Sequence, residues 1–348
     1  MPSISIDTYF ACTLMVSVVL VSTVLSSGIL LPHIDSTQSM NQEGYFQALS
    51  EYVLSNVGAP ADWGVNETSV PYTFGLAKAN SPYTNELDID KICRLNVQNA
   101  FALTYVEMLR AARLKDIAMS ISVSQLMDIL VSLSSNSTST DSAKYIFEIY
   151  ATEDGMPVQT SLHYYVVARD YTYDAFNTTA NNGTGYIEFE IPNASNGTVS
   201  LIIFARASHD ARITAYCTYS FGHLSAEPSP YGTFATMTPL NYTLLTESNS
   251  SDTTIEKCYA LSYAHSFELA LRSDGRYEIP RILESGPIVL VVSGLSNSTF
   301  FVEYTSYPQI PFHAGADFTP AESYSYGVIV TVKNTLLRVG LLFGGISQ

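Results

Sequence analysis

The sequence predicts an α+β protein: a long N-terminal hydrophobic helix, a second helix, and then predominantly antiparallel β structure in one or two Ig-like β-sandwiches. First, no charged residue occurs from Tyr9 to Leu31, and such a run forms a helix about 35 Å long, enough to cross a bilayer core. Second, apolar residues recur at helical spacing before Asp116 and at a spacing of two after it. Third, the 24 tyrosines, with many serines and threonines, suit half-buried pleated strands.

The composition excludes two classes of protein. The 348 residues carry a net charge of −16, so the chain lacks the basic face that phosphate neutralisation requires, and we expect no nucleic-acid partner. Only 14% of residues are charged and 47% are hydrophobic, which is the reverse of a disordered acidic chain.

Two interpretations of the N-terminus compete. A cleaved signal peptide would use the small residues Ser26 and Gly28 as its cleavage site, but no Lys or Arg precedes Tyr9. A retained anchor explains why the apolar run continues through Leu31 to Pro32, and we favour it. The implied partner of this helix is a lipid bilayer or like subunits, in a homo-oligomer or filament.

Asp7 is the candidate helix-packing acid, because a lone carboxylate is costly to bury before an apolar helix. It could pair with a neighbouring subunit's N-terminal amine. The alternative, which we favour, places it among the lipid headgroups.

Two further segments have helical periodicity. Residues 36–56 carry apolar side chains at spacings of three and four, and Gly58 and Pro60 end that pattern. A second helix is expected over about residues 90–114, with Asp88 or Asp90 as its N-cap.

After Asp116 the alternating segments predict short strands separated by turn-rich loops. Besides the segment that begins at Ile117, the candidates are Lys144–Ala151, Leu162–Arg169, Gly185–Ile191, Val199–Ala207, Arg212–Phe221, Tyr259–Leu271, Ile288–Gly294, Thr299–Ser306, Val328–Lys333 and Leu336–Phe343. Strands at this spacing are typical of β-sandwiches. The stretch Ser132–Ser142 is nearly all Ser, Thr and Asn and predicts a loop or linker.

The Pro/Ser-rich break at Ala226–Gly232 is the best internal boundary. We therefore expect four parts, which are a transmembrane or filament-core helix (1–35), a helical pilin-like region (36–125), a first β-sandwich (126–225) and a second β-sandwich (226–348).

The sequons indicate an extracellular, glycosylated chain. The asparagines that begin an N-x-S/T triplet are Asn66, Asn136, Asn177, Asn182, Asn193, Asn196, Asn241, Asn249 and Asn297. They make up more than half of all asparagines, where chance predicts about a fifth. We expect N-linked glycans at these positions and location on the outer face of the cell envelope.

The cysteines fit that compartment. We favour a disulfide between Cys217 and Cys258, which lie in or beside strand-like segments, and leave the pairing of Cys93 open. Without a C-x-x-C pair, the sequence predicts no structural zinc site.

The sequence carries no catalytic signature. None of the six histidines forms H-x-H or H-E-x-x-H, and there is no G-x-S-x-G elbow, Walker loop or G-x-G-x-x-G. We therefore assign no catalytic residue, metal ligand or cofactor. Asp88 and Asp90 lack the further ligands of a calcium loop, so helix capping is preferred. Trp63, the only tryptophan, could stack on a sugar, but we favour a plug that holds its loop to the core.

Three motifs resemble a family of archaeal surface proteins described as type IV pilin-like. They are Gly58-x-Pro60-x-x-Trp63-Gly64, Phe74-Gly75-Leu76-Ala77 and Leu87-Asp88-x-Asp90-Lys91-Ile92-x-Arg94-Leu95-Asn96. The closing stretch Gly327–Phe343 also resembles that family, so the similarity covers the first 125 residues and the last 25. The resemblance implies a hydrophobic helix packed in a filament core, with Asp7 as the fifth residue of a chain cut after Pro2.

Together these observations predict a non-enzymatic structural surface protein, either a pilin-like subunit or an anchored ectodomain of the cell envelope. One alternative is an adhesin or glycan-binding module that uses Tyr-rich loops. A secreted hydrolase with a dispersed site is less favoured.

Overall fold

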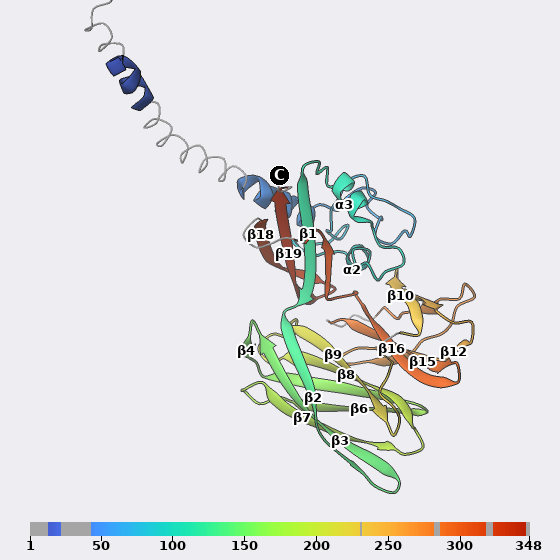
Figure 1. Ribbon diagram of the computed structural model, residues 1–348. Helices are drawn as coiled ribbons and strands as arrows, with labels where there is room; N and C mark the ends of the chain where they lie inside the picture. The colour runs from blue at the N-terminus through green and yellow to red at the C-terminus, as the bar shows by residue number, and fades with distance from the viewer. Residues whose placement is uncertain (1–12, 22–42, 230–231, 282–285, 318–322, 346–348) are drawn as a thin grey trace, which may run out of the picture. The chain divides into compact units, whose positions relative to one another are not determined.

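The computed structural model describes residues 13–21, 43–229, 232–281, 286–317 and 323–345 (Figure 1). The chain divides into two compact units, Met1–Glu51 and Tyr52–Gln348. The first unit contributes helical residues 13–21 and the start of a helix at residue 43. The second unit contains all the strands, which pair antiparallel in five sheets within the described ranges.

The predicted α+β class with a long N-terminal hydrophobic helix is wrong. Strand makes up 52% of the structure and helix 11%, and its four helices are all short in the described part of the chain. Within the predicted helix 1–35, the described helix covers only residues 13–21. None of the described helices has both the length and the apolarity to span a membrane.

The physical reason is that an uncharged apolar run shows that its residues are hydrophobic but does not by itself set the length of a helix. Asp7 lies outside the described residues.

The predicted helix over residues 90–114 is two short helices, α2 (Ile89–Cys93) and α3 (Tyr105–Ala111). Two asparagines separate them. The side-chain oxygen of Asn96 accepts from the backbone N–H of Gln98 at 2.9 Å, and that of Asn99 accepts from Phe101 at 2.9 Å. Such side-chain bonds offer the backbone an alternative to helix. The predicted helix 36–56 is described over residues 43–55.

Four of the sheets contain the strands from Met127 to Tyr307. Sheet I has the order β2-β3-β4 with β7 also on β3: β2 Met127–Thr138, β3 Ser142–Glu153, β4 Met156–Pro157 and β7 Thr184–Pro192. Sheet II has the order β6-β5-β8-β9: β5 Thr160–Ala168, β6 Tyr171–Thr178, β8 Gly197–Ala207 and β9 Thr214–His223. Sheet III has the order β13-β12-β15-β16: β12 Thr253–Leu261, β13 Ser266–Glu268, β15 Ile288–Ser296 and β16 Thr299–Tyr307. Sheet IV has the order β10-β11-β14: β10 Phe234–Leu240, β11 Thr243–Ser248 and β14 Tyr277–Glu278.

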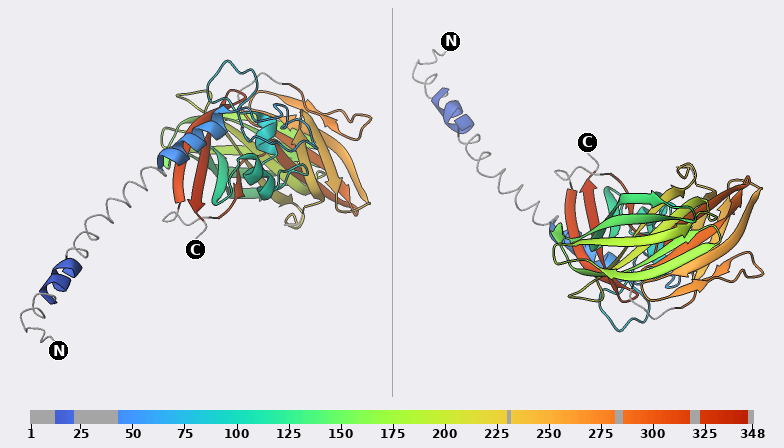
Figure 2. Two further views of the ribbon diagram at one scale, coloured as in Figure 1. Left: turned by 90° about the horizontal axis from the view of Figure 1, so that it is seen from above. Right: turned by 90° about the horizontal axis from the view of Figure 1, so that it is seen from below.

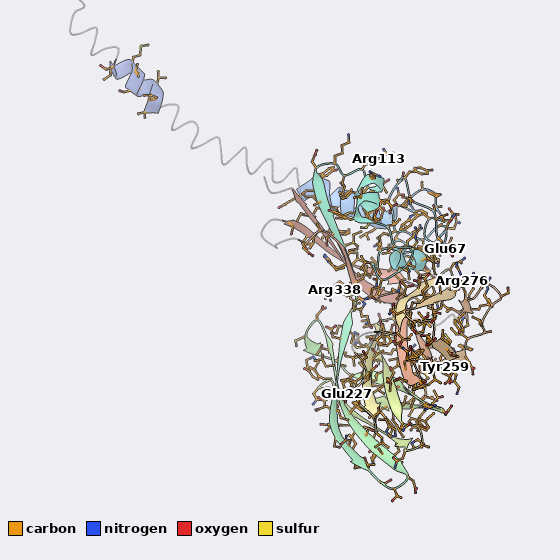
Figure 3. The ribbon with its side chains drawn as sticks, turned by 45° about the vertical axis from the view of Figure 1, so that its right-hand side comes forward. Glu67, Arg113, Glu227, Tyr259, Arg276 and Arg338 are labelled. Atoms are coloured by element: carbon orange, nitrogen blue, oxygen red, sulfur yellow. The ribbon has the colours of Figure 1, made fainter. Side chains whose placement is uncertain are left out.

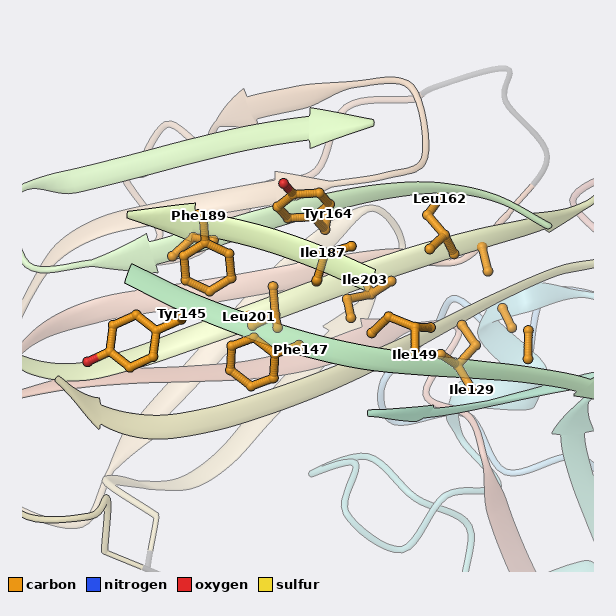
Figure 4. Close-up of a cluster of buried hydrophobic side chains, with 14 of the residues drawn as sticks. Ile129, Tyr145, Phe147, Ile149, Leu162, Tyr164, Ile187, Phe189, Leu201 and Ile203 are labelled. Carbon is orange, nitrogen blue, oxygen red and sulfur yellow. The ribbon is translucent and has the colours of Figure 1, made fainter. Parts of the chain in front are cut away.

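These four sheets form one stack in the order I, II, III, IV, because each neighbouring pair of sheets shares a hydrophobic core. Figure 2 shows the strands from two further sides. In the first core, side chains such as Phe147 of β3 and Phe189 of β7 meet Leu201 and Ile203 of β8 (Figure 4). In the second core, Val167 and other side chains of sheet II meet side chains of sheet III. The third core lies between sheets III and IV.

The two inner sheets are buried on both faces. Along β5, Tyr164 and Val166 point into the first core, whereas Tyr165 and Val167 point into the second. The same holds for β8 and β15, whose central residues are all buried. This burial explains why these strands have nearly continuous apolar sequences instead of alternating ones.

Sheet V joins distant parts of the chain in the order β17-β1-β19-β18: β1 Ile117–Gln125, β17 Phe312–Gly315, β18 Ser323–Val332 and β19 Thr335–Gly345. β19 lies between β1 and β18 and pairs with both along its length. The segment before α2 attaches to this sheet, because Leu87 N–H donates to the Thr331 carbonyl at 2.9 Å.

The predicted linker Ser132–Ser142 is also wrong, because most of it continues β2 and pairs with β3. The strand left no apolar pattern in the sequence, because every residue of β2 from Ser132 onward is exposed and polar side chains occur on both of its faces apart from Leu133. A register shift between Leu133 and Ser135 further disturbs the alternation.

Candidate functional site

The predicted glycosylation sites lie at the surface. Eight of the nine sequon asparagines are exposed, and Asn193 is half-buried. Several occupy turns: Asn241 lies between β10 and β11, Asn297 lies between β15 and β16, and both have positive φ. An exposed amide in a turn is accessible to a modifying enzyme.

Asn193 differs from the other eight because it is half-buried and its amide bonds two carbonyls, whereas the amides of Asn177 and Asn249 bond one carbonyl each. Its side-chain nitrogen donates to the carbonyls of Ser139 at 3.1 Å and Thr140 at 3.0 Å. Ser195, the hydroxyl residue of the same triplet, is buried. Glycosylation of Asn193 would therefore require both hydrogen bonds to break.

The predicted disulfide between Cys217 and Cys258 is not formed, and both cysteines are free. Cys258 lies in the core between sheets III and IV, whereas Cys217 packs against the core between sheets I and II. Burial raises the pKa of Cys258 to about 12 and also raises that of Cys217. Cys93 is free and fully buried, and burial raises its pKa well above the usual value.

The motifs that carry the family resemblance contribute to the buried core of the second unit, here called the buried centre. Trp63 is fully buried, its ring nitrogen donates to the Gly75 carbonyl at 3.2 Å, and its ring stacks near Phe74. The prediction that Trp63 plugs its loop is confirmed. Gly75 is required there because a Cβ would lie 2.3 Å from the Asn56 carbonyl oxygen.

Two buried cations of α2 and its C-terminus hold the surrounding loops. The Lys91 ammonium donates to the carbonyls of Val57 at 2.7 Å and Ala77 at 2.8 Å. Burial lowers the pKa of Lys91. The Arg94 guanidinium donates to backbone carbonyls, including those of Phe101 and Ser69 at 2.8 Å each. These charges satisfy loop carbonyls, so they act in the fold rather than in a binding site.

Glu67 and Arg276 tie the same loop to the turn before β14 (Figure 3). The Arg276 hydrogen bond holds the pKa of Glu67 below its usual value and raises that of Arg276.

The paired carboxylates at the start of α2 have different roles. Asp88, one of the two predicted candidates, is the N-cap and accepts from the N–H groups of Asp90 at 3.0 Å and Lys91 at 3.2 Å. Asp90 is buried instead, and accepts from the Tyr307 hydroxyl at 2.8 Å and from Asn241 N–H at 2.7 Å. Burial raises the pKa of Asp90 to about 6.

Two histidines that could have been catalytic are buried and bonded through both ring nitrogens. His163 contacts the Tyr263 carbonyl at 2.5 Å and the Asp174 carboxylate at 2.9 Å. His223 contacts the Tyr145 hydroxyl at 2.9 Å and a backbone carbonyl at 3.1 Å. In the described ranges, no three His, Cys, Asp or Glu residues are grouped as metal ligands.

A surface groove runs along two edge strands, β9 of sheet II and β16 of sheet III. It consists of two adjoining hollows of about 460 and 520 Å³, which share Tyr216, Tyr304 and Pro311. Uncharged polar side chains make up half of its further lining residues and include Gln98, Ser220, Thr305, Gln125, Thr152 and Thr218. Apolar side chains such as Met127, Ile129 and Leu130 line the second hollow as well. Glu303 and Asp128 are its charged residues, and no Lys, Arg or His is among the described residues that line it.

Hydrogen bonds fix the walls and floor of this groove. The Tyr216 hydroxyl donates to the Ile310 carbonyl at 2.6 Å, and burial raises the pKa of Tyr216 to about 12. Gln309 donates to the Met237 carbonyl at 3.1 Å and accepts from Asn99 at 2.7 Å. Tyr304, by contrast, is an exposed residue, at 42%.

The Gln125 side chain closes one position of the β9 edge. Its amide oxygen accepts from Tyr216 N–H at 2.6 Å and its amide nitrogen donates to the Tyr216 carbonyl at 3.3 Å. The side chain thus replaces a neighbouring strand at that residue. Neither Gln125 nor the two tyrosines stood out in the sequence, because only the fold brings β1, β9 and β16 together.

The fold defines the chain as a mostly antiparallel β protein built on a stack of sheets. No family model matches it, and neither does any curated protein. Among solved structures, HBP35 of Porphyromonas gingivalis is similar over 52% of this chain and 63% of that chain, at 13% identity and a TM-score of 0.21. Human GIVD cytosolic phospholipase A2 is similar over 67% of this chain and 33% of that chain, at 11% identity and a TM-score of 0.15. The chain spans less than two thirds of either structure, and likenesses at these TM-scores carry no functional statement.

Proposed function

We propose that this chain is a non-enzymatic cell-surface protein whose β-rich unit faces outward and carries N-linked glycans. The exposure of eight of the nine sequon asparagines is the observation that carries the proposal. Sequons are enriched in the sequence, and nearly all are accessible on the folded chain. The filament role depended on the long N-terminal helix and is not part of the proposal.

The state of the cysteines is compatible with an oxidising compartment. The thiolate is the form that reacts in disulfide formation, and burial disfavours it. Because burial raises the pKa values of Cys93, Cys217 and Cys258, these thiols are protected without being paired.

Glycopeptide mapping of the native protein tests the proposal. We expect glycans at exposed sequons such as Asn136 and Asn297, and none at Asn193, whose amide is held by two carbonyls. Asn182→Gln should remove one glycan mass, whereas Asn181→Gln, at the neighbouring exposed asparagine outside any sequon, should remove none.

A protease added to intact cells provides a second measurement. We expect the protease to cleave an outward-facing chain. A lysine-labelling reagent that cannot cross the membrane is an equivalent probe and should label the chain's surface lysines. Unmodified asparagines throughout the native chain, together with protection in intact cells, would contradict the proposal.

A further inference from the structure

We propose that the groove between β9 and β16 binds a neutral oligosaccharide, with Tyr304 as the stacking residue. This inference rests on the proposed surface location and adds a role to it, which is recognition of glycans on another surface. It rests on the charge, the exposed tyrosine, the hydrogen-bonding groups and the blocked strand edge of the groove.

Charge excludes anionic ligands. Glu303 and Asp128 are the charged residues of the lining, and the whole chain carries a net charge of −16. A phosphate, sulfate or uronate would meet like charge with no cation to pair with it among the described lining residues.

The polar groups of the lining match hydroxyls. Each sugar hydroxyl both donates and accepts hydrogen bonds, and so do the amide of Gln98 and the hydroxyls of Ser220 and Thr305. Gln98 and Ser220 are exposed, so their polar groups can contact a ligand without a rearrangement of the core.

The two tyrosines supply the apolar contact. Tyr216 is fixed by its bond to the Ile310 carbonyl, while Tyr304, which lines the same hollows, is 42% exposed as a residue. The C–H face of a sugar ring is the apolar part of an otherwise hydrophilic molecule, and an aromatic ring covers it. Because both hollows share these tyrosines, a chain of several sugar units can pass over them.

The Gln125 contact argues against a peptide strand as the occupant. A peptide that extends a sheet needs the unpaired backbone groups of an edge strand. At Tyr216 those groups already bond to Gln125. A ligand of the groove therefore contacts side chains rather than the β9 backbone there.

The test uses the full chain, purified in detergent from a bacterial host that adds no N-glycans. It is applied to an array of neutral hexose and N-acetylhexosamine oligosaccharides, sialylated and sulfated oligosaccharides, and extended peptides. The array is followed by calorimetry on the binders. Since this protein carries no glycans of its own, the result is independent of the glycosylation proposed above.

We expect neutral oligosaccharides to bind and Tyr304→Ala to lose about tenfold or more in affinity. Tyr304→Phe, which keeps the ring, should stay within about threefold. The matched control is Tyr72→Ala, because Tyr72 is 70% exposed and lies outside the groove, and it should leave affinity unchanged. Binding confined to acidic oligosaccharides or to peptides, no binding at all, or full affinity in Tyr304→Ala would each overturn the proposal.

Discussion

Replacing the buried Asp90 with Asn should change how the stability of the protein depends on pH. The pKa of Asp90 is raised to about 6 by burial, from 3.8 for an ordinary Asp. The folded state therefore binds this proton more tightly than the unfolded state. The contribution of Asp90 to the free energy of unfolding is largest below pH 3.8 and is lost as the pH rises through 6.

The difference between the two pKa values corresponds to about 3 kcal/mol over the whole range, of which about 2 kcal/mol falls between pH 4.5 and pH 7.5. Asn is neutral at every pH, and its amide oxygen can still accept from the Tyr307 hydroxyl and Asn241 N–H. We expect Asp90→Asn to become more stable relative to the natural chain by about 2 kcal/mol between those two pH values.

Urea unfolding followed by circular dichroism at both pH values measures this change. Glu67, Glu86 and Glu107 have lowered pKa values, so their contributions run in the opposite direction, and only the comparison with the variant isolates Asp90. Any effect of the Asn side chain on stability that is independent of pH cancels when the difference between variant and natural chain is compared at the two pH values. The matched control is Asp116→Asn, at an exposed carboxylate.

A stability difference between Asp90→Asn and the natural chain that is the same at both pH values would refute this reasoning. Tyr307→Phe gives an independent check. It removes a hydroxyl that donates to the Asp90 carboxylate, and should therefore raise the pKa of Asp90 further and move the transition to higher pH.

Three further predictions concern the buried centre and the thiols. Lys91→Met should lower the free energy of unfolding by about 3 kcal/mol, because it leaves two loop carbonyls without their charged donor. Gly75→Ala should lower it by about 2 kcal/mol or more, because the new Cβ meets the Asn56 carbonyl oxygen at 2.3 Å. Denaturant titrations measure both effects. Cys258, with a pKa raised to about 12, should react with a thiol reagent at least about a hundredfold more slowly in the folded protein than in urea.

Matched changes at open positions serve as controls. Lys115→Met alters an exposed lysine and should cost little, and Gly327→Ala adds a Cβ with no atom within 4 Å. If Lys115→Met destabilises the protein as much as Lys91→Met, or Gly327→Ala as much as Gly75→Ala, the buried contacts are not the cause of the lost stability. Rapid native labelling of Cys258 together with the half-buried Cys217 would contradict the protection assigned to burial.

Several strands were predictable because burial left a mark on their sequences, although β10 and β11, which also contain buried residues, were not among the predicted strands. β8 and β15 have long apolar runs because both of their faces are covered, and β3 alternates because only one face is. Exposed edge strands leave no such mark. β6 has no fully buried residue and was not predicted, and the exposed half of β2 was taken for a linker.

The helices and the groove show the other limit of sequence reasoning. The apolar run before Pro32 shows that its residues are hydrophobic but does not set the helix length assigned to it. Asn96 and Asn99 divide the second predicted helix through local bonds. The walls of the groove, Tyr216 and Tyr304, come from different sheets and are 88 positions apart in the chain (304 − 216). No local pattern joins them.

The central position of β19 in sheet V determines when this part of the chain can be completed. β1, the first strand of the fold, pairs along its length with β19, and β18 also pairs with β19. During synthesis β1 must therefore wait for residues more than two hundred positions later, on the order of ten seconds or more at ordinary translation rates. A chain that is exported while unfolded would make this delay harmless, because sheet V would then close only after the whole sequence had arrived on the other side.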